Sequence, residues 1–112
     1  MTRVITLKGL PKTSTNKFYS GMHWSKRQRL VKQFWAIVRS QTTEKFTKPC
    51  RVEYNFYFEN NPLDVSNCGA MIKLVEDILF PDDSNKVVKQ ITITSEKSIT
   101  ERLRIKIEEL KQ

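Results

Sequence analysis

The sequence has few of the residues that mark disulfide-rich, zinc-binding or membrane-spanning proteins. Its 112 residues include two cysteines, one histidine and three glycines, and no apolar run approaches the roughly 20 residues that span a bilayer. Cys50 and Cys68 form no CxxC pair, and with a single histidine they provide too few ligands for a structural zinc site. The apolar stretch after Met1 breaks at Lys8 and is too short for a signal peptide. These absences predict a cytoplasmic protein without a disulfide framework.

Acidic residues are almost missing from the first half of the chain. Residues 1–51 contain 12 Lys or Arg and one acid, Glu44, which gives +11. Residues 52–112 contain 8 Lys or Arg and 11 acids, which gives −3, and the two halves sum to the formal charge of +8. A basic segment joined to an acidic one predicts a surface for a polyanion, and a nucleic acid first of all. The alternative is a solvated basic helix face with no partner.

Hydrophobic periodicity predicts four strands and two helices. The strands are expected over residues 3–8, 50–59, 87–94 and 103–107. The helices are expected over 26–40, capped by Ser25, and from Ser66 or Asn67 to Leu79, while 11–22 has the composition of a polar loop. The order β-α-β-α-β-β predicts one domain, 1–112, of the α/β (α+β) class, with a mixed four-stranded sheet and two helices.

The same patterns predict which side chains are buried. In the helix over 26–40, the apolar positions spaced by three or four residues include Trp35, which we therefore expect in the core beside Phe34. The strand over 50–59 should bury one alternating face, made of Val52, Tyr54, Phe56 and Phe58. The second helix should bury Met71, Leu74, Val75 and Ile78, and turn away Ala70, Lys73, Glu76 and Asp77. Both cysteines are expected to be buried thiols.

Six of the eleven acids in the second half are concentrated between residues 59 and 83. They are Glu59, Asp64, Glu76, Asp77, Asp82 and Asp83, and among them only Lys73 is basic. Carboxylates without histidines suit Mg²⁺, which prefers hard oxygen ligands and activates water in phosphodiester hydrolysis. The alternatives are that residues 82–85 form an ordinary acidic turn, and that Asp77 simply pairs with Lys73 four residues earlier.

Several short motifs, taken in order along nearly the whole chain, resemble the RusA family of Holliday-junction resolvases. They are Asn16-Lys17-Phe18-Tyr19, His23-Trp24-Ser25 with the basic helix, Pro62-Leu63-Asp64-Val65-Ser66-Asn67, Lys73-Leu-Val-Glu-Asp77 and Asp82-Asp83-Ser84. The resemblance implies a bacterial or phage-encoded, homodimeric endonuclease that needs Mg²⁺, with Mn²⁺ as the alternative ion, and no small-molecule cofactor. Such an enzyme nicks four-way DNA junctions symmetrically, in recombination and repair, and does not associate with membranes.

Residue by residue, the resemblance implies a catalytic set of Asp64, Asp83 and Lys73. Asp64 and Asp83 would hold the metal, while Lys73 would stabilise the charge that develops on the phosphate. The wider set of expected metal ligands is Asp64, Asp83, Asp82, Asp77 and Asn67. For Asp77, a structural pairing with Lys73 is as consistent with the sequence as a catalytic role.

The chain departs from the family pattern at three places. Ser66 stands where the second aspartate is expected, the stretch from Asn67 to Lys73 is about three residues longer, and the segment between Asp77 and Asp82 is shorter. A helix over 68–79 is about 18 Å long. The four extended residues from Leu79 to Asp83 return only about 13 Å. Asp64 and Asp83 therefore share a metal only if this helix is shorter or tilted.

The basic half is expected to supply the affinity for branched DNA. Cations and planar side chains are interleaved in the loop and the first helix, which suits phosphate contacts and stacking on unpaired bases. The expected contact residues are Lys12, Lys17, Tyr19, His23, Trp24, Lys26, Arg27, Arg29 and Lys32. The aromatic residues can equally be loop residues that pack on the core. Two other functions stay open: a catalytically weakened protein that binds branched DNA without cutting it, and a small RNA-binding protein.

Overall fold

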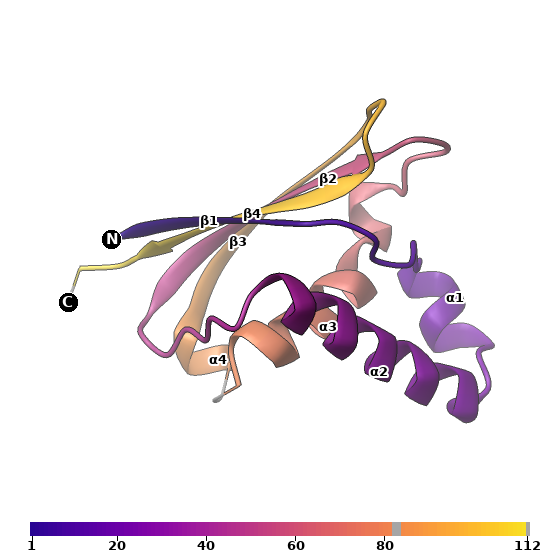
Figure 1. Ribbon diagram of the computed structural model, residues 1–112, viewed down its shortest axis with the longest axis horizontal. Helices are drawn as coiled ribbons and strands as arrows, with labels where there is room; N and C mark the ends of the chain where they lie inside the picture. The colour runs from indigo at the N-terminus through magenta and orange to yellow at the C-terminus, as the bar shows by residue number, and fades with distance from the viewer. Residues whose placement is uncertain (82–83, 112) are drawn as a thin grey trace.

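A mixed four-stranded sheet carries its helices on one face, as the computed structural model shows for residues 1–81 and 84–111 (Figure 1). The strands are β1 (Thr2–Leu7), β2 (Cys50–Phe58), β3 (Val88–Lys97) and β4 (Arg102–Glu109). The helices are α1 (Thr15–Ser20), α2 (Trp24–Gln41), η1 (Val65–Asn67), α3 (Gly69–Leu79) and α4 (Ser84–Val87). The predicted α+β class and mixed sheet are confirmed. Within the described ranges, none of the helices has the length and apolar character needed to cross a membrane.

The strand order β1-β4-β2-β3 explains why the sheet is mixed. β4 pairs antiparallel with both β1 and β2, whereas β2 and β3 are parallel. A parallel pair needs a crossover connection, and the chain makes it through η1, α3 and α4. As a result, the part of the chain that precedes α3 lies near the end of β2, and β3 forms one edge of the sheet.

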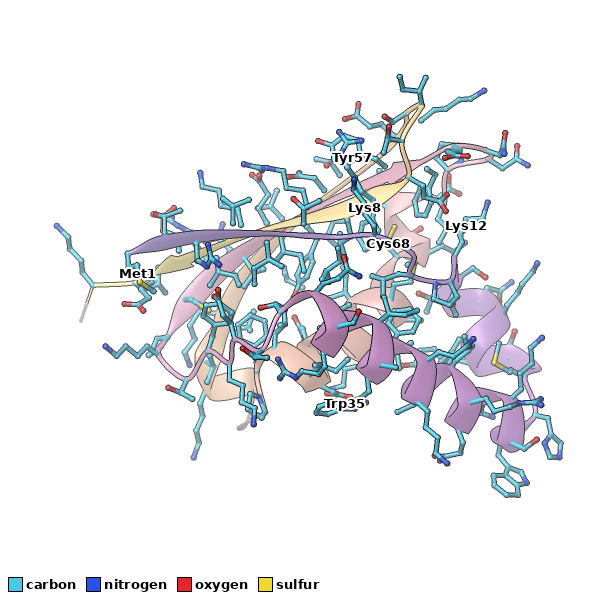
Figure 2. All side chains as sticks on the ribbon, viewed as in Figure 1. Met1, Lys8, Lys12, Trp35, Tyr57 and Cys68 are labelled. Atoms are coloured by element: carbon cyan, nitrogen blue, oxygen red, sulfur yellow. The ribbon has the colours of Figure 1, made fainter. Side chains whose placement is uncertain are left out.

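The core lies between the sheet and the helices. β2 buries the predicted alternating face of Val52, Tyr54, Phe56 and Phe58, and α2 contributes Phe34 and Val38, which are fully buried. The prediction for Trp35 is wrong, because its side chain remains 41% exposed and lies on the side of α2 away from the sheet (Figure 2). One residue further along the helix turns a side chain by about 100°, and this turn carries Trp35 from the buried face of α2 toward solvent.

α3 is buried more widely than its periodicity indicates. The sheet lies on one side of it and α1 and α2 pack on others, so that the predicted stripe is confirmed but Ala70 is also fully buried. Glu76 is half-buried rather than turned to solvent, whereas Lys73 and Asp77 are exposed as expected. α1 was not predicted at all: it forms inside the expected loop over 11–22, with Ser14 as its N-cap.

Both cysteines are buried, as predicted, and neither forms a disulfide. Burial raises the pKa of the Cys50 thiol to about 11, with smaller contributions from the nearby carboxylates of Glu109 and Glu76. Burial also raises the pKa of Cys68. A thiol reacts as its thiolate, so that neither residue is suited to act as a nucleophile at neutral pH.

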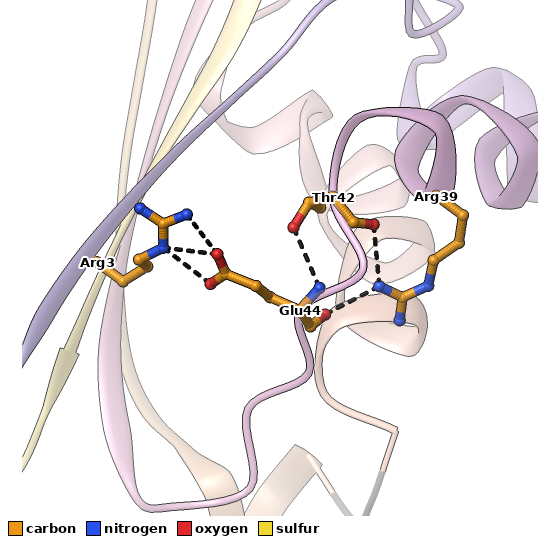
Figure 3. A network of polar contacts seen from close by, with 4 residues as sticks. All are labelled: Arg3, Arg39, Thr42 and Glu44. Carbon is orange, nitrogen blue, oxygen red and sulfur yellow. Dashed lines mark hydrogen bonds and ion pairs between the residues drawn. The ribbon is translucent and has the colours of Figure 1, made fainter.

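One arginine fastens the ends of two helices together (Figure 3). Arg39 donates from Nη1 to the carbonyl oxygens of Thr42 and Glu44, at 3.3 and 2.9 Å, and from Nη2 to the carbonyl oxygen of Ile78 at 2.6 Å. It therefore satisfies carbonyl groups that follow α2 and carbonyl groups at the end of α3. The Glu44 side chain in turn accepts from Arg3 of β1 at 2.7 and 2.9 Å, which ties the same loop to the sheet.

Candidate functional site

The corner formed by α1 and the first turns of α2, residues 15–32, exposes basic side chains to solvent. α1 is held by Phe18, which is buried, and by the Ser14 hydroxyl, which accepts from the backbone N–H of Lys17 at 3.1 Å. Because only Phe18 faces inward from this short helix, Lys17 and Tyr19 are left exposed. The alternative that the corner aromatics pack on the core therefore holds for Phe18 and not for Tyr19, which is 56% exposed.

His23 starts α2, in place of the expected Ser25. Its Nδ1 accepts a hydrogen bond from the backbone N–H of Ser25 at 3.2 Å and lies 2.8 Å from the Ser25 hydroxyl. A histidine that accepts through Nδ1 carries its proton on Nε2 when the ring is neutral. The ring itself is exposed and lies beside Trp24, with 5.7 Å between the ring centres. Trp24 is 68% exposed, so that planar groups stand at the start of the helix.

A shallow hollow opens at this corner, between the two helices. Its volume is about 390 Å³, and it is lined by Lys17, Ser20, Gly21, Met22, His23 and Lys26. No carboxylate lines it, and no acidic residue stands in the first turn of either helix. The positive end of an 18-residue helix therefore coincides with two lysines, an arrangement that attracts phosphate.

Most cations of this corner have no internal partner within the described residues. Among the described residues, Lys17, Lys26, Arg29 and Lys32 form no ion pair. On the helix-free face of the sheet, by contrast, Arg104 binds Glu53 and Asn55, and Arg51 binds Glu108. Arg102 lies over the ring of Tyr57, which points away from the helices (Figure 2). These three arginines thus have partners within the chain, whereas the corner keeps cations available for an external anion.

Two of the expected DNA contacts are already used inside the chain. Lys12 donates from Nζ to the carbonyl oxygens of Asn60 and Asn61, each at 3.0 Å, and lies over the Phe58 ring. Arg27 donates from Nε to the carbonyl oxygen of Met22 at 3.1 Å and shapes the turn between α1 and α2. The structure therefore gives both residues a role in fixing loops, and leaves the free charge on their neighbours.

The Asp64–Asn67 segment lies directly against α1. Asn67 accepts from the backbone N–H of Asn16 at 3.3 Å, and the Thr15 hydroxyl accepts from the N–H of Ala70 at 2.9 Å. Gly69 permits this approach, since a Cβ at that position would lie 3.3 Å from the Thr15 hydroxyl oxygen. The Asp64 side chain is exposed just before η1. Two motifs some 50 residues apart in sequence, 16–19 and 62–67, are thereby neighbours in space.

Lys73 and Asp77 form an ion pair on the exposed side of α3. Lys73 Nζ lies 3.2 Å from Asp77 Oδ1, and this contact raises the pKa of Lys73. Tyr19 of α1 is close enough to contribute a small electrostatic effect on the same lysine. The pairing agrees with the structural alternative for Asp77, and Lys73 lies on the side of α3 that borders α1.

Glu76, one of the six acids between residues 59 and 83, lies beside this pair. Its carboxylate accepts from the Tyr54 hydroxyl at 3.3 Å, and its partial burial raises its pKa despite that hydrogen bond and the nearby charge of Lys73. An acid whose pKa is raised in the folded state binds its proton more tightly there than in the unfolded chain. Charged Glu76 therefore lowers stability at neutral pH, and the penalty disappears as the pH falls through the folded pKa.

Replacing Glu76 with Gln should therefore raise the melting temperature at neutral pH and leave it unchanged well below 4.5, the ordinary value for Glu. The amide keeps an oxygen acceptor for Tyr54 and removes the charge. Thermal unfolding of both proteins across this pH range measures the difference. Glu96→Gln on the exposed surface of β3 is the matched control and should show no such trend. A difference that grows in acid would contradict the assignment.

The expected metal ligands are divided between the two ends of α3. Asp64 and Asn67 precede the helix, while Asp77 stands about 12 Å further along it than Gly69. Asp82 and Asp83 lie outside the described residues, which flank them with Pro81 after α3 and Ser84 at the start of α4. Over residues 1–81 and 84–111, no three His, Cys, Asp or Glu side chains gather as the ligands of a metal ion do. The oxygen donors of Asp64 and Asn67 suit Mg²⁺ in kind and need a further carboxylate to complete a site.

Comparison with known proteins assigns no family to this chain. No protein-family model matches it, and no curated protein sequence matches it either. The interpretation of the site therefore rests on its own residues: unpaired cations and exposed aromatics on α1 and α2, fastened to an acidic segment before α3.

Proposed function

We propose that this chain is a magnesium-dependent, structure-selective DNA endonuclease that acts on four-way junctions. One observation supports it above the others: α1, which carries the unpaired Lys17, is hydrogen-bonded through Asn16 to Asn67 and through Thr15 to Ala70. A DNA backbone held by Lys17 and Lys26 is thereby brought to the edge of the molecule that carries the carboxylate of Asp64. The proposed binding residue Lys17 and the proposed metal ligand Asp64 thus belong to segments that contact each other.

The roles in the proposed reaction follow from the chemistry of each side chain. Asp64 and Asn67, completed by Asp83, would hold Mg²⁺, which supplies an activated water and neutralises the leaving oxygen. Lys73 offers its ammonium group to the phosphate, because an exposed partner such as Asp77 is exchanged at little cost. Lys17, Lys26 and Arg29 hold and orient the DNA backbone. Two symmetric nicks require two copies of the chain, so that the active form is a homodimer.

A second function, binding of branched DNA without cutting, is favoured by a specific observation. Ser66 stands where the RusA pattern has a second aspartate, and Asp77 is already paired with Lys73. Both features reduce the negative charge available to a cation. A protein of this kind would protect or present junctions through the same α1–α2 corner. An RNA-binding function predicts affinity for hairpin RNA without a need for divalent metal.

Cleavage of a labelled four-way junction distinguishes these functions. With Mg²⁺ or Mn²⁺ the junction should be nicked, and EDTA should abolish the reaction. Asp64→Asn and Asp83→Asn should each slow it by about 100-fold or more, since losing one charge-stabilising group costs that much in rate. Glu96→Gln, an acid on β3, should cut normally.

Equal amounts of product with metal, with EDTA and with both variants would contradict a metal-dependent enzyme that uses Asp64 and Asp83. Metal-independent binding of the junction in preference to linear duplex, without product, would identify the binding protein instead. Preference for hairpin RNA over both DNA forms would contradict the DNA function.

A further inference from the structure

α2 carries an exposed stripe that contains both tryptophans of the chain. Trp24 and Trp35 are eleven residues apart, which places them about 20° apart around the helix axis and about 16 Å apart along it. Trp24 is 68% and Trp35 41% exposed. Gln28 and Val31 lie between them on the same side of the helix, with Gln28 exposed and Val31 partly buried. Two large aromatic side chains exposed on one helix face mark a candidate surface for binding a partner.

The Trp35 ring is held in place before any partner arrives. The guanidinium carbon of Arg39 lies 5.6 Å from the centre of the Trp35 ring. Arg39 itself is fixed by the carbonyl oxygens of Thr42, Glu44 and Ile78. A ring oriented in this way loses little conformational freedom when a flat ligand stacks on it, which favours binding.

The charge of α2 selects the kind of partner. The helix contains five cations and no acid, the cations being Lys26, Arg27, Arg29, Lys32 and Arg39. Self-association through this stripe would bring two such helices together at a high electrostatic cost. A polyanion avoids this electrostatic cost, and one that also presents flat apolar surfaces can stack on the tryptophan rings. Paired bases in a duplex keep their faces stacked on one another, whereas unpaired bases offer them to a protein.

We infer that the Trp24–Trp35 stripe binds single-stranded DNA, with bases stacked on both tryptophans and the backbone following Lys32 and its neighbouring cations. This inference rests on the proposed binding of branched DNA and adds the class of strand that α2 takes. A junction whose arms are frayed or gapped, or a flap, would be held through its unpaired strand along α2. The four-way centre would then lie at the α1–α2 corner.

Tryptophan emission tests the inference directly, because the chain has two tryptophans. Trp24→Phe leaves Trp35 as the single reporter, and Trp35→Phe leaves Trp24. Titration with a thymidine homopolymer should quench each reporter, whereas a blunt linear duplex should leave the Trp35 emission unchanged. If fluorescence anisotropy shows that the homopolymer binds while Trp35 emission stays constant, the inference is overturned. A shift of Trp35 emission with protein concentration alone would also overturn it, by assigning the stripe to self-association.

Affinity provides an independent measurement. Trp35→Leu keeps an apolar side chain but removes the aromatic face, and should weaken homopolymer binding by about 5- to 100-fold. Trp35→Phe keeps a face for stacking and should stay close to the native affinity. Ile99→Ser removes an exposed apolar side chain from the connection between β3 and β4 and should change nothing. Equal affinities for the native protein and Trp35→Leu would overturn the inference.

The outcomes separate this inference from the proposed nuclease. If the protein nicks fully paired junctions but Trp35 emission does not respond to single strands, the proposed nuclease stands and the binding of single strands by α2 is overturned. If Trp35 emission responds to single strands but the protein never cuts, the binding by α2 stands and the proposed nuclease is overturned. Absence of binding to every nucleic acid would overturn both.

Discussion

Replacing Phe34 with Ala should lower the free energy of unfolding by about 3–5 kcal/mol, the cost of removing a fully buried aromatic ring. The same replacement at Trp35, the next residue, should cost less than about 1 kcal/mol, because surface positions contribute little. Urea-induced unfolding followed by circular dichroism measures both values. The contrast is large because the Phe34 ring is fully buried in the core, whereas the Trp35 ring is partly exposed to solvent.

The two variants control for each other, since both shorten an aromatic side chain in the same turn of the same helix. The gain in helix propensity that Ala brings is similar at the two positions and therefore cancels in the comparison. Similar losses at both positions would show that Trp35 is part of the core after all and would remove the basis for a stacking surface on α2.

Neutralising the corner should weaken DNA binding by on the order of 100-fold at physiological salt. The variant carries Lys17→Gln, Lys26→Gln and Arg29→Gln, which removes three cations that have no internal partner in the described structure. Each lost phosphate contact should also reduce the salt dependence of log K by about 0.9. Titration of a labelled junction at several salt concentrations measures the affinity and the slope together.

The matched control removes the same charge from the other end of the molecule. Lys45→Gln, Lys48→Gln and Lys111→Gln lower the formal charge from +8 to +5, as the corner variant does, and all three positions are exposed. This control should keep most of the affinity and the slope. Equal losses in both variants would mean that net charge, rather than the α1–α2 corner, drives the binding.

Strands whose faces differ sharply were predictable from sequence alone. β2 alternates because one face packs under the helices and the other is open, and Leu103, Ile105 and Ile107 of β4 follow the same rule. α1 gave no such signal, since only Phe18 of its six residues is buried and one contact defines no period. Trp35 was misassigned because helical spacing places a side chain at the margin of an apolar stripe without telling where the covering sheet ends.

The site was predictable in its residue types and not in its assembly. The absence of acids before Glu44 predicted a basic surface in the first half of the chain, and the α1–α2 corner carries cations without ion-pair partners in the described structure. The contact between α1 and the Asp64–Asn67 segment depends on hydrogen bonds across some 50 residues, for which Gly69 was the sole hint in sequence. Lys12 was expected to contact DNA, but it binds two backbone carbonyl oxygens within the chain. Nothing in the sequence distinguishes such a lysine from one that is free to bind a phosphate.

The position of β3 at the edge of the sheet bears on how the protein must be handled. Residues 90–95, Gln-Ile-Thr-Ile-Thr-Ser, carry no charge and favour β-structure, and in the described structure only β2 pairs with this strand. Such an edge is a template on which another chain can add a strand, and the charge of Lys89 at the start of this segment opposes such aggregation. Variants that remove this charge should therefore aggregate at lower protein concentrations than the native chain.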